Sequence, residues 1–588
     1  MVPLASTVLL ALAGSSYGAI YEKFDDVPTR QFDFVVVGGG TAGNVVANRL
    51  TENPDFSVLV LEAGGSHEDL LVPQIPALAL SLSGSSLDWN FTAKVGPGNR
   101  TVLYNRGFVL GGSSTINWMA YTRGNSDDWD RYAAVTGDLG WSWKNMQSYI
   151  RKNERIVPPA DQHDTVGQWD PAVHGRSGIN AVSLSGYTHE LEKRTIQLSK
   201  AAGNESEFRF NLDMNSGDQL GVGWAQSTIL NGARSSSATS YLGPKYINRP
   251  NLHVLLHARV TRILQGNPNN TAELAFNDVQ FTQNNGTTLQ HVTASKEIVV
   301  SAGTIGTPHI LLNSGIGDSA HLEALGLDAI HHLPSVGQNL TEQPALGNNW
   351  VVNTTDTNES NLGNPDLMKQ WEETRSGPLV DPIILAFGWF RVPSNATIFQ
   401  SVQDPAAGPK TPHYELPMIN GILGLPRPGE NYISAGTIVV SPASRGSVTL
   451  ASANPLVYPS IDLNLLSSEF DLYAMREAVR SAVKLMSSDV WNGYLVRPAF
   501  DVNTDSDEQL DAYILSNSQG AVHPVGTSSM SPKGAKWGVV DPNLLVKGIT
   551  GVRVVDASVM PFVPAGHTQA PTYMVAERGA DLIKKDWM

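Results

Sequence analysis

Hydrophobic residues near the start of the chain form two short continuous runs separated by a segment with helical spacing. The run from Phe32 to Val37 is apolar and β-prone, as expected for a strand buried on both faces of a parallel sheet. The next apolar positions recur at helical spacing up to Asn53–Pro54, which ends the helix: Ala42, Val45, Val46 and Leu50. The following run, "SVLVLEAGG" at 57–65, predicts a second strand that ends at Glu62. Residues 31–65 therefore predict a βαβ unit.

The turn of this unit contains glycines in a G-x-G-x-x-G spacing, at Gly38, Gly40 and Gly43. Such glycines allow a tight turn and a close approach of the backbone to a pyrophosphate, which the positive end of the helix dipole attracts. Glu62 follows 19 residues after Gly43 and can accept hydrogen bonds from a ribose. The unit predicts a dinucleotide site. The alternative is a glycine-rich turn that serves only helix–strand packing.

Similar apolar strands recur far along the chain. One runs from Glu297 to Val300, and another, "GVRVVDASVMP", reaches Asp556. Because 588 residues exceed what one core usually supports, we expect two domains. We predict a discontinuous nucleotide-binding domain at 31–139, 225–335 and 515–585, and a substrate-binding domain at 140–224 and 336–514, where tryptophan, proline and polar loops are more frequent.

Composition narrows the class of protein. Hydrophobic residues at 41% and charged residues at 16% are typical of a soluble globular protein. A net charge of −15, without a basic run, argues against a nucleic-acid or membrane-surface partner. The chain has no cysteine, which excludes disulfides and thiolate metal sites, and no metal-ligand cluster is evident in the sequence.

The first 18 residues contain an apolar run from Val8 to Ala13 that is too short to span a bilayer. They resemble a secretory signal peptide with cleavage after Ser15 or Gly18, although its positive region is weak. The alternative is a frayed apolar N-terminus. Nine N-x-S/T sequons mildly favour a secreted, extracellular glycoprotein: Asn90, Asn99, Asn204, Asn269, Asn285, Asn339, Asn353, Asn358 and Asn395.

Several separated motifs together resemble the glucose–methanol–choline (GMC) family of flavin oxidoreductases. They are "VVVGGGTAGNVVANRL…VLVLEAG", "LGGSSTIN" at 110–117, "GTIGTPHILLNSGIG" at 303–317, "HPVGT" at 523–527 and "RVVDASVMP…GHTQAPTYMVAERGADLI" at 553–583. Within the family, "RYAAVTGD" and "NERIVPPADQH" are similar to aryl-alcohol oxidases. The resemblance implies an α/β fold (α+β overall), with a Rossmann-like FAD-binding domain and a substrate domain whose antiparallel sheet is flanked by helices. We expect the protein to be a monomer.

The same resemblance implies FAD and names the residues that would hold it. These are Gly38, Gly40, Thr41, Ala42, Gly43, Glu62, Ala63, Gly112, Asn117, Val260, Asp556, Ala557, His567 and Thr568. Family members with covalent flavin carry a histidine in the "GGSS" loop, where this chain has Ile116. The FAD is therefore expected to be noncovalent.

His523 directly precedes Pro524, which holds it out of the helical region. The sequence around His523 fits two alternatives: a proton-transfer group that is held in one orientation, and an ordinary loop histidine. The resemblance matches His523 and His567 to the family's catalytic pair. It implies that His523 takes the hydroxyl proton of an alcohol while a hydride passes to flavin N5, with oxygen (giving hydrogen peroxide) or a quinone as the final acceptor.

Some positions depart from the family pattern. Phe108 stands where a cation is usual, and Glu342–Gln343 replaces Asp–His. In the expected substrate pocket, Val522 replaces a phenylalanine and Trp118 a tyrosine, and "NGILGLPRPG" lacks an aromatic. We expect primary aromatic or conjugated alcohols as substrates. The alternatives are a sugar or furan dehydrogenase or oxidase of the same family and a flavin-binding protein without turnover.

Overall fold

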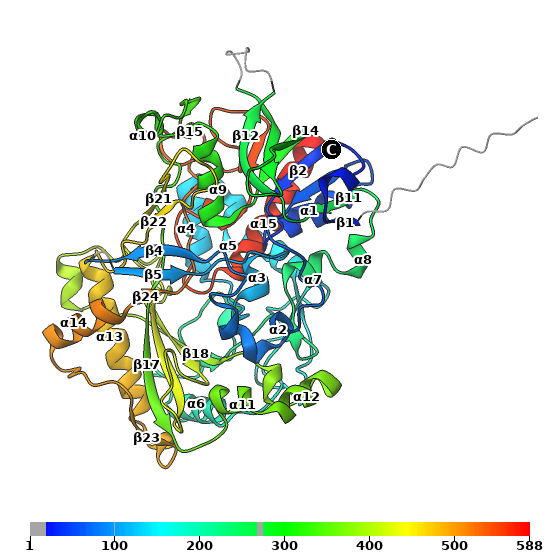
Figure 1. The fold of residues 1–588 in the computed structure, drawn as a ribbon. Coiled ribbons are helices and arrows are strands. Elements are labelled where there is room, and N and C mark those ends of the chain that lie inside the picture. Colours follow the sequence, from blue (N-terminus) through cyan, green and yellow to red (C-terminus); the bar gives the residue numbers. More distant parts are fainter. Residues whose placement is uncertain (1–18, 99, 267–273) are drawn as a thin grey trace, which may run out of the picture.

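The computed structural model describes residues 19–98, 100–266 and 274–588, so the expected signal peptide and the sequons at 99 and 269 lie outside the described residues. The chain forms two large sheets, one in each half of an elongated molecule (Figure 1). The first sheet and the helices α1 (Gly43–Leu50) and α15 (Gln569–Trp587) form one half of the molecule, and the second sheet lies in the opposite half. This arrangement confirms the expected mixed α/β fold.

The first sheet has the strand order β1-β11-β3-β2-β14-β13-β12, and β25 also pairs with β14. The pairs that join the first strands are parallel, whereas β13 and β12 extend the sheet in antiparallel fashion. The bounds are β1 Ala19–Tyr21, β2 Gln31–Val37, β3 Val58–Leu61, β11 Leu252–Leu255, β12 Arg259–Gln265, β13 Phe276–Thr282, β14 Gln290–Val300 and β25 Val552–Val554.

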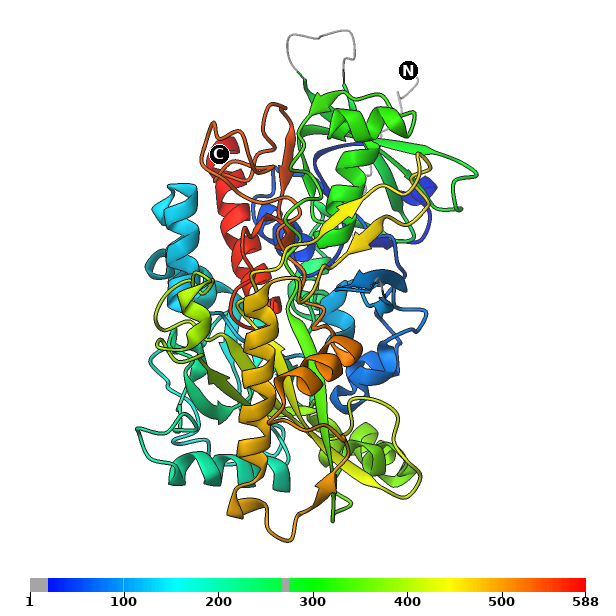
Figure 2. The ribbon, with the colours of Figure 1, turned by 90° about the vertical axis from the view of Figure 1, so that its left-hand side faces the viewer.

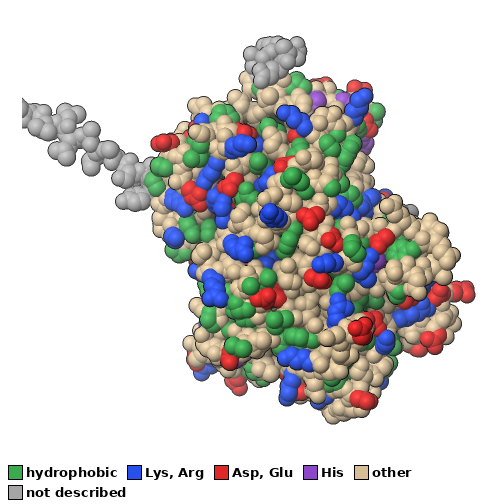
Figure 3. Space-filling model, turned by 180° about the vertical axis from the view of Figure 1, so that it is seen from behind, with side chains coloured by type: hydrophobic (Ala, Val, Ile, Leu, Met, Phe, Trp, Pro, Cys, Tyr) green, Lys and Arg blue, Asp and Glu red, His purple; other side chains and the backbone are tan. Residues whose placement is uncertain are grey.

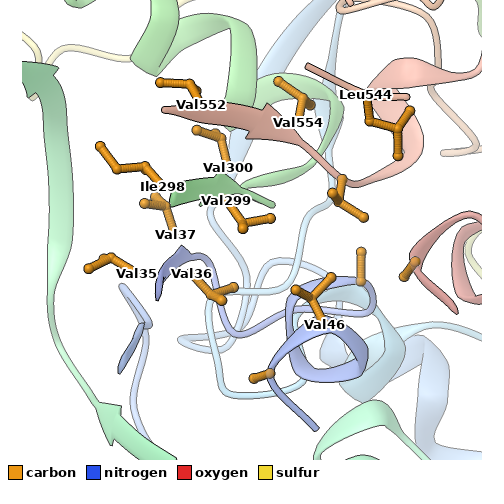
Figure 4. Close-up of a cluster of buried hydrophobic side chains, with 14 of the residues drawn as sticks. Val35, Val36, Val37, Val46, Ile298, Val299, Val300, Leu544, Val552 and Val554 are labelled. Carbon is orange, nitrogen blue, oxygen red and sulfur yellow. The ribbon is translucent and has the colours of Figure 1, made fainter. Parts of the chain in front are cut away.

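The register of these strands determines where the nucleotide site lies. Val37 is opposite both Leu61 and Val300, and Val300 is opposite Val554. The strands therefore end together, and the residues that follow them share one edge of the sheet. Val36, Val299 and their neighbours, with Val46 of α1, are buried in the core beneath this edge (Figure 4). Continuous apolar strands form here because the sheet is covered on both faces.

The second sheet is antiparallel, in the order β23-β17-β20-β19-β18-β8, with β24 also paired to β17. Helix α13 (Glu469–Met486) packs across β20 and β19, with α14 (Asp507–Asn517) beside it, and α6 (Glu190–Ala201) packs on β8 and β18 (Figure 2). The strands are β8 Gly221–Trp224, β17 Pro344–Val352, β18 Ile384–Phe390, β19 Tyr414–Ile419, β20 Asn431–Val439, β23 Leu495–Pro498 and β24 Gln519–Gly520.

A small third sheet, in the order β21-β22-β4-β5, links distant parts of the chain. Its strands are β4 Phe91–Val95, β5 Arg100–Tyr104, β21 Ser447–Thr449 and β22 Ser460–Asp462. Helix α5 (Trp143–Asn153), from the segment expected to belong to the substrate domain, packs against α15. The domain boundaries themselves stay predictions.

Acidic and basic side chains are interspersed on the face seen in Figure 3. In the described part of the chain, no helix has the length and apolar character that a membrane span needs.

Candidate active site

A cavity of about 950 Å³ reaches from the carboxyl edge of the first sheet to strands of the second sheet. It brings together almost all the site residues predicted from the sequence. Those that line it are Gly38, Gly40, Thr41, Ala42, Glu62, Ala63, Gly112, Asn117, Trp118, Val260, Val522, His523, Asp556, Ala557, His567 and Thr568.

Gly43 lies behind the cavity lining, and its role is close packing. A Cβ placed on Gly43 would lie 1.9 Å from the carbonyl oxygen of Gly38, so only glycine lets α1 begin so close to β2. Gly112 is constrained in a similar way, since its φ is +53° and a Cβ there would lie 2.8 Å from the Cα of Gly40. These glycines let two loops meet and leave backbone, without side chains, facing the cavity at the start of α1.

Glu62 joins the glycine turn to the end of β3. Its Oε2 accepts a hydrogen bond from the N–H of Gly39 at 2.9 Å, and its Oε1 accepts one from the N–H of Gly64 at 2.7 Å. Burial raises the pKa of Glu62 to about 7. A buried carboxyl group held in this way has a fixed position on the cavity wall.

Asp556 ties β25 to the start of α9 (Gly303–Asn313). Its Oδ2 accepts from the N–H of Gly303 at 2.9 Å and from the hydroxyl of Thr307 at 2.6 Å, and burial raises its pKa. The carboxyl group therefore caps this helix while the residue lines the cavity.

Asn117 is fixed by Arg234, a residue that the sequence analysis did not single out. The Nη1 of buried Arg234 donates to the side-chain oxygen of Asn117 at 2.9 Å and to its carbonyl at 2.7 Å. Burial lowers the pKa of Arg234 to about 9. The Nδ2 of Asn117 donates to Gln569, the first residue of α15. Asn117 is thereby held against the N-terminus of a helix 19 residues long.

His523 and His567 lie side by side in the cavity, although they are 44 residues apart in the sequence. Their ring centroids are 4.6 Å apart and the ring planes cross at 72°. His523 follows β24, and His567 precedes α15. The two loops therefore meet in the cavity, one leaving the second sheet at β24 and the other leading into α15.

The pKa of His523 lies well below its ordinary value. Burial is the main cause, followed by the charges of His567 and Arg106. The Nδ1 of His523 lies 2.8 Å from the Oε1 of Gln343, which is an acceptor. A neutral imidazole that donates from Nδ1 has its lone pair at Nε2, so the site holds a neutral base.

His567 is held by its backbone and by a buried acid. Its N–H donates to the hydroxyl of Thr122 at 2.8 Å, and its Nε2 lies 3.0 Å from the Oε1 of Glu415. Glu415 is 1% exposed, and neither of its carboxylate oxygens makes a well-aligned hydrogen bond among the described residues. The carboxyl group of Glu415 therefore lies against the Nε2 edge of the His567 ring. The ring of Phe387 also packs on His567, with centroids 5.1 Å apart.

Two of the residues around the histidine pair were noticed in the sequence only as departures from the family pattern, and Glu415 was not noticed at all. Glu342 and Gln343 both contact His523, whereas the sequence assigned them no role. Glu415 lies within the β-prone segment "HYELPMI", where a single acid among apolar residues was the one clue to its position.

The departure at Phe108 is explained by local packing. Phe108 contacts Trp89 edge to face, with centroids 4.6 Å apart. The guanidinium of Arg259 lies 5.3 Å from the centroid of the same tryptophan ring, and both Trp89 and Arg259 line the cavity. An arginine from β12 thus places a cation against this aromatic cluster.

A glycine turn at a helix N-terminus, an acid at the next strand end and a histidine pair in one cavity define a dinucleotide-dependent oxidoreductase. Comparisons with known proteins identify its family. Family models described as GMC oxidoreductase match residues 32–345 and 442–576. The chain belongs to the GMC oxidoreductase family and is an FAD-dependent oxidoreductase acting on CH–OH donors.

Several relatives match over nearly the whole chain. The chain is 40% identical to dehydrogenase eriK of Hericium erinaceus, covering 98% of each protein. It is also 40% identical to pyranose dehydrogenase 3 of Leucoagaricus meleagris, covering 99% of this chain and 98% of the relative. A solved structure of a fungal aryl-alcohol oxidase is similar with a TM-score of 0.80 and 25% identity, covering 95% of this chain and all (100%) of the other.

The cavity fits FAD. The glycine turn can cradle the pyrophosphate, because a Cβ at Gly112 would close the gap between the two loops. Glu62 can hold the adenosine ribose, and Val260 lines the same end of the cavity. The N-terminus of α15, with Thr568 and Gln569 on the cavity wall, offers a positive dipole end to the ring region.

Proposed function

We propose that this enzyme oxidises primary alcohols, with His523 as the base that takes the hydroxyl proton. The observation that carries this proposal is the buried pair of rings with centroids 4.6 Å apart, one of which has a strongly lowered pKa. A base that is neutral at mild pH can accept a proton without first losing one.

Each histidine has a separate task in this mechanism. The Nε2 of His523 accepts the proton as the alcohol oxygen develops negative charge. His567 hydrogen-bonds the same oxygen, so that the carbinol C–H bond points away from the histidine pair. Bound FAD would supply the acceptor for the hydride that leaves the carbinol carbon. Proton transfer to a positioned base typically contributes about 10²–10⁴-fold in rate.

The wall beyond the histidine pair favours an apolar alcohol. It includes Trp118, Leu346, Ile384, Ile419, Ile422, Leu423 and Ile438. Two polar residues on this wall already bond to the protein. Asn349 bonds both backbone groups of Leu423, and the hydroxyl of Thr437 donates to the carbonyl of Leu346. Because unpaired hydroxyls are costly to bury, this wall suits an aromatic or conjugated alcohol better than a sugar.

A second candidate is a dehydrogenase that oxidises sugars or furans and passes electrons to a quinone. The observation in its favour is the 40% identity to pyranose dehydrogenase 3 over nearly the whole chain. A wide cavity in which Val522 stands where aryl-alcohol oxidases have a phenylalanine would also admit larger ring substrates.

Anaerobic mixing with benzyl alcohol, hydroxymethylfurfural and glucose, followed by flavin absorbance, separates these candidates. We expect the fastest bleaching with benzyl alcohol. Faster bleaching with glucose would favour the second candidate. Reoxidation by oxygen, with hydrogen peroxide as product, or by benzoquinone then distinguishes an oxidase from a dehydrogenase. A yellow protein that no alcohol bleaches would refute both.

We also propose that the enzyme is secreted and acts as a monomer. The N-terminal apolar run and the sequons support secretion. N-terminal sequencing of protein from the culture medium tests cleavage after Ser15 or Gly18, and sedimentation tests the oligomeric state.

A further inference from the structure

The segment that carries His523 is held at successive backbone groups. The carbonyl of Val522 accepts from the guanidinium of Arg106, and the N–H of His523 donates to the Oε1 of Glu342 at 3.0 Å. The hydroxyl of Thr304 donates to the carbonyl of Pro524 at 2.7 Å. A histidine ring on a backbone fixed in this way has few positions available.

Val522 shows that this segment is also strained. Its φ is +58°, in the left-handed region that β-branched residues rarely adopt. Such a conformation is strained and persists only where neighbouring contacts hold it. The bond from Arg106 to the Val522 carbonyl is one of these contacts.

Gln343 has an amide whose orientation is determined by its surroundings. Its Nε2 lies 3.2 Å from the carbonyl oxygen of Val440, 3.1 Å from that of Pro564 and 3.2 Å from that of Gly566. An oxygen in that place would face three other oxygens. The amide nitrogen must therefore point to the carbonyls, and Oε1 must point to the Nδ1 of His523.

We propose that Gln343 is a positioning residue that fixes His523 as the Nδ1–H tautomer and so makes Nε2 the nitrogen that takes the alcohol proton. The amide oxygen can only accept, so the Nδ1 opposite it must carry hydrogen. Gln343 is fully buried, so its amide is shielded from water. The consequence for catalysis rests on the proposed role of His523, whereas the tautomer itself does not.

Glu342 supports the same arrangement from the other side. Its Oε1 accepts from the N–H of Gln343 at 2.8 Å as well as from that of His523, and its Oε2 accepts from the hydroxyl of Tyr104. Burial raises the pKa of Tyr104 well above 10, so its hydroxyl keeps its proton and donates. Glu342 and Gln343, the pair that departs from the family's Asp–His, thus act together on one histidine.

The direct test is ¹⁵N NMR of the FAD-bound enzyme labelled only at histidine, with His523 assigned by comparison with His523→Ala. We expect a pyrrole-type signal for Nδ1 and a pyridine-type signal for Nε2. In Gln343→Met, which is similar in size but offers no amide oxygen, we expect the two nitrogens to exchange character in part. The reverse pattern in the native enzyme, or no change in Gln343→Met, would overturn the inference.

The rate of flavin reduction in variants provides a second test of the proposal. We expect Gln343→Met to keep FAD and to slow flavin reduction by at least about 10-fold, but by no more than the factor of about 10²–10⁴ that loss of a base gives. Gln343→His should restore much of the rate, since imidazole can donate to a carbonyl and accept from Nδ1. Asn348→Leu is the matched control. It removes another fully buried amide that bonds a carbonyl, that of Ala435, and should change thermal stability without changing the reduction rate.

The outcomes separate the two ideas. A normal reduction rate in His523→Ala would refute the base assignment and leave the tautomer to be read by NMR. A slow His523→Ala with a Gln343→Met as fast as the native enzyme would refute the positioning role alone.

Discussion

Replacement of His523 by alanine tests the assignment on which the mechanism depends. The substitution removes the ring that packs 4.6 Å from His567 and leaves the Oε1 of Gln343 without its partner. The residues of the FAD cradle lie on other elements, so cofactor content should be unchanged. We expect flavin reduction to slow by about 10²–10⁴-fold. At 1.36 kcal/mol for each factor of ten, this range corresponds to about 2.7–5.4 kcal/mol of transition-state stabilisation.

We expect the loss of rate to lie in the upper part of that range, because the backbone N–H and the ring Nδ1 of His523 both have hydrogen-bond partners. A base that is already aligned loses little entropy when it reacts. The unpaired Gln343 oxygen also predicts a stability loss of about 1–3 kcal/mol.

The assay is stopped-flow absorbance of the oxidised flavin after anaerobic mixing with benzyl alcohol at saturating concentrations. Absorbance of the resting variant first confirms that FAD is bound. His332→Ala is the control, since His332 is an exposed histidine of the strand His331–His332. Added imidazole should restore part of the rate by entering the vacated space. A His523→Ala variant that reduces its flavin at the native rate would refute the reasoning.

Three further predictions follow from individual residues. Because burial lowers the pKa of His523, it stays neutral as pH falls through its ordinary value of about 6.5, so flavin reduction should keep its full rate there. The same shift means that the unfolded chain takes up the proton first, so this residue's contribution to stability is lost as pH falls below about 6.5, which thermal unfolding at several pH values can measure. Ile116 provides no nucleophile, so acid precipitation should release all FAD into the supernatant, and a yellow pellet would contradict noncovalent binding. Glycans on secreted protein, mapped by peptide mass spectrometry, should spare the buried Asn358 and the half-buried Asn339 and occupy the exposed sequons of the described residues, which are Asn90, Asn204, Asn285, Asn353 and Asn395.

The sequence predicted the first sheet well because its strands are buried on both faces. Phe34 to Val37 and Val58 to Leu61 are continuous apolar runs, and each ends just before a residue that the site uses. Parallel strands that end together then place Gly38, Glu62 and Asp556 on one edge without any further information. The antiparallel extension by β12 and β13 was not predicted, since their alternating pattern does not indicate which sheet they join.

The surroundings of the histidines could not be predicted in the same way. Glu415 reaches His567 from a strand about 150 residues away, and Gln343 reaches His523 across 180 residues. Such contacts depend on strand order and register in an antiparallel sheet, which local patterns do not determine. The family resemblance named the two histidines but gave no function to the residues that orient them.

The pairing of β24 with β17 is the physical link between the fold and the base. Gly520 is opposite Pro344 and Gln519 is opposite Ala345, and the N–H of Ala521 donates to the carbonyl of Gln343 at 2.9 Å. This register brings the residue just before β17 beside the residue three positions after β24. A shift of one residue would reverse the faces of the side chains and leave Nδ1 of His523 opposite a different group. The strand β24 is only two residues long. Its pairing with β17 therefore determines the orientation of the His523 ring more directly than any side chain in the substrate pocket does.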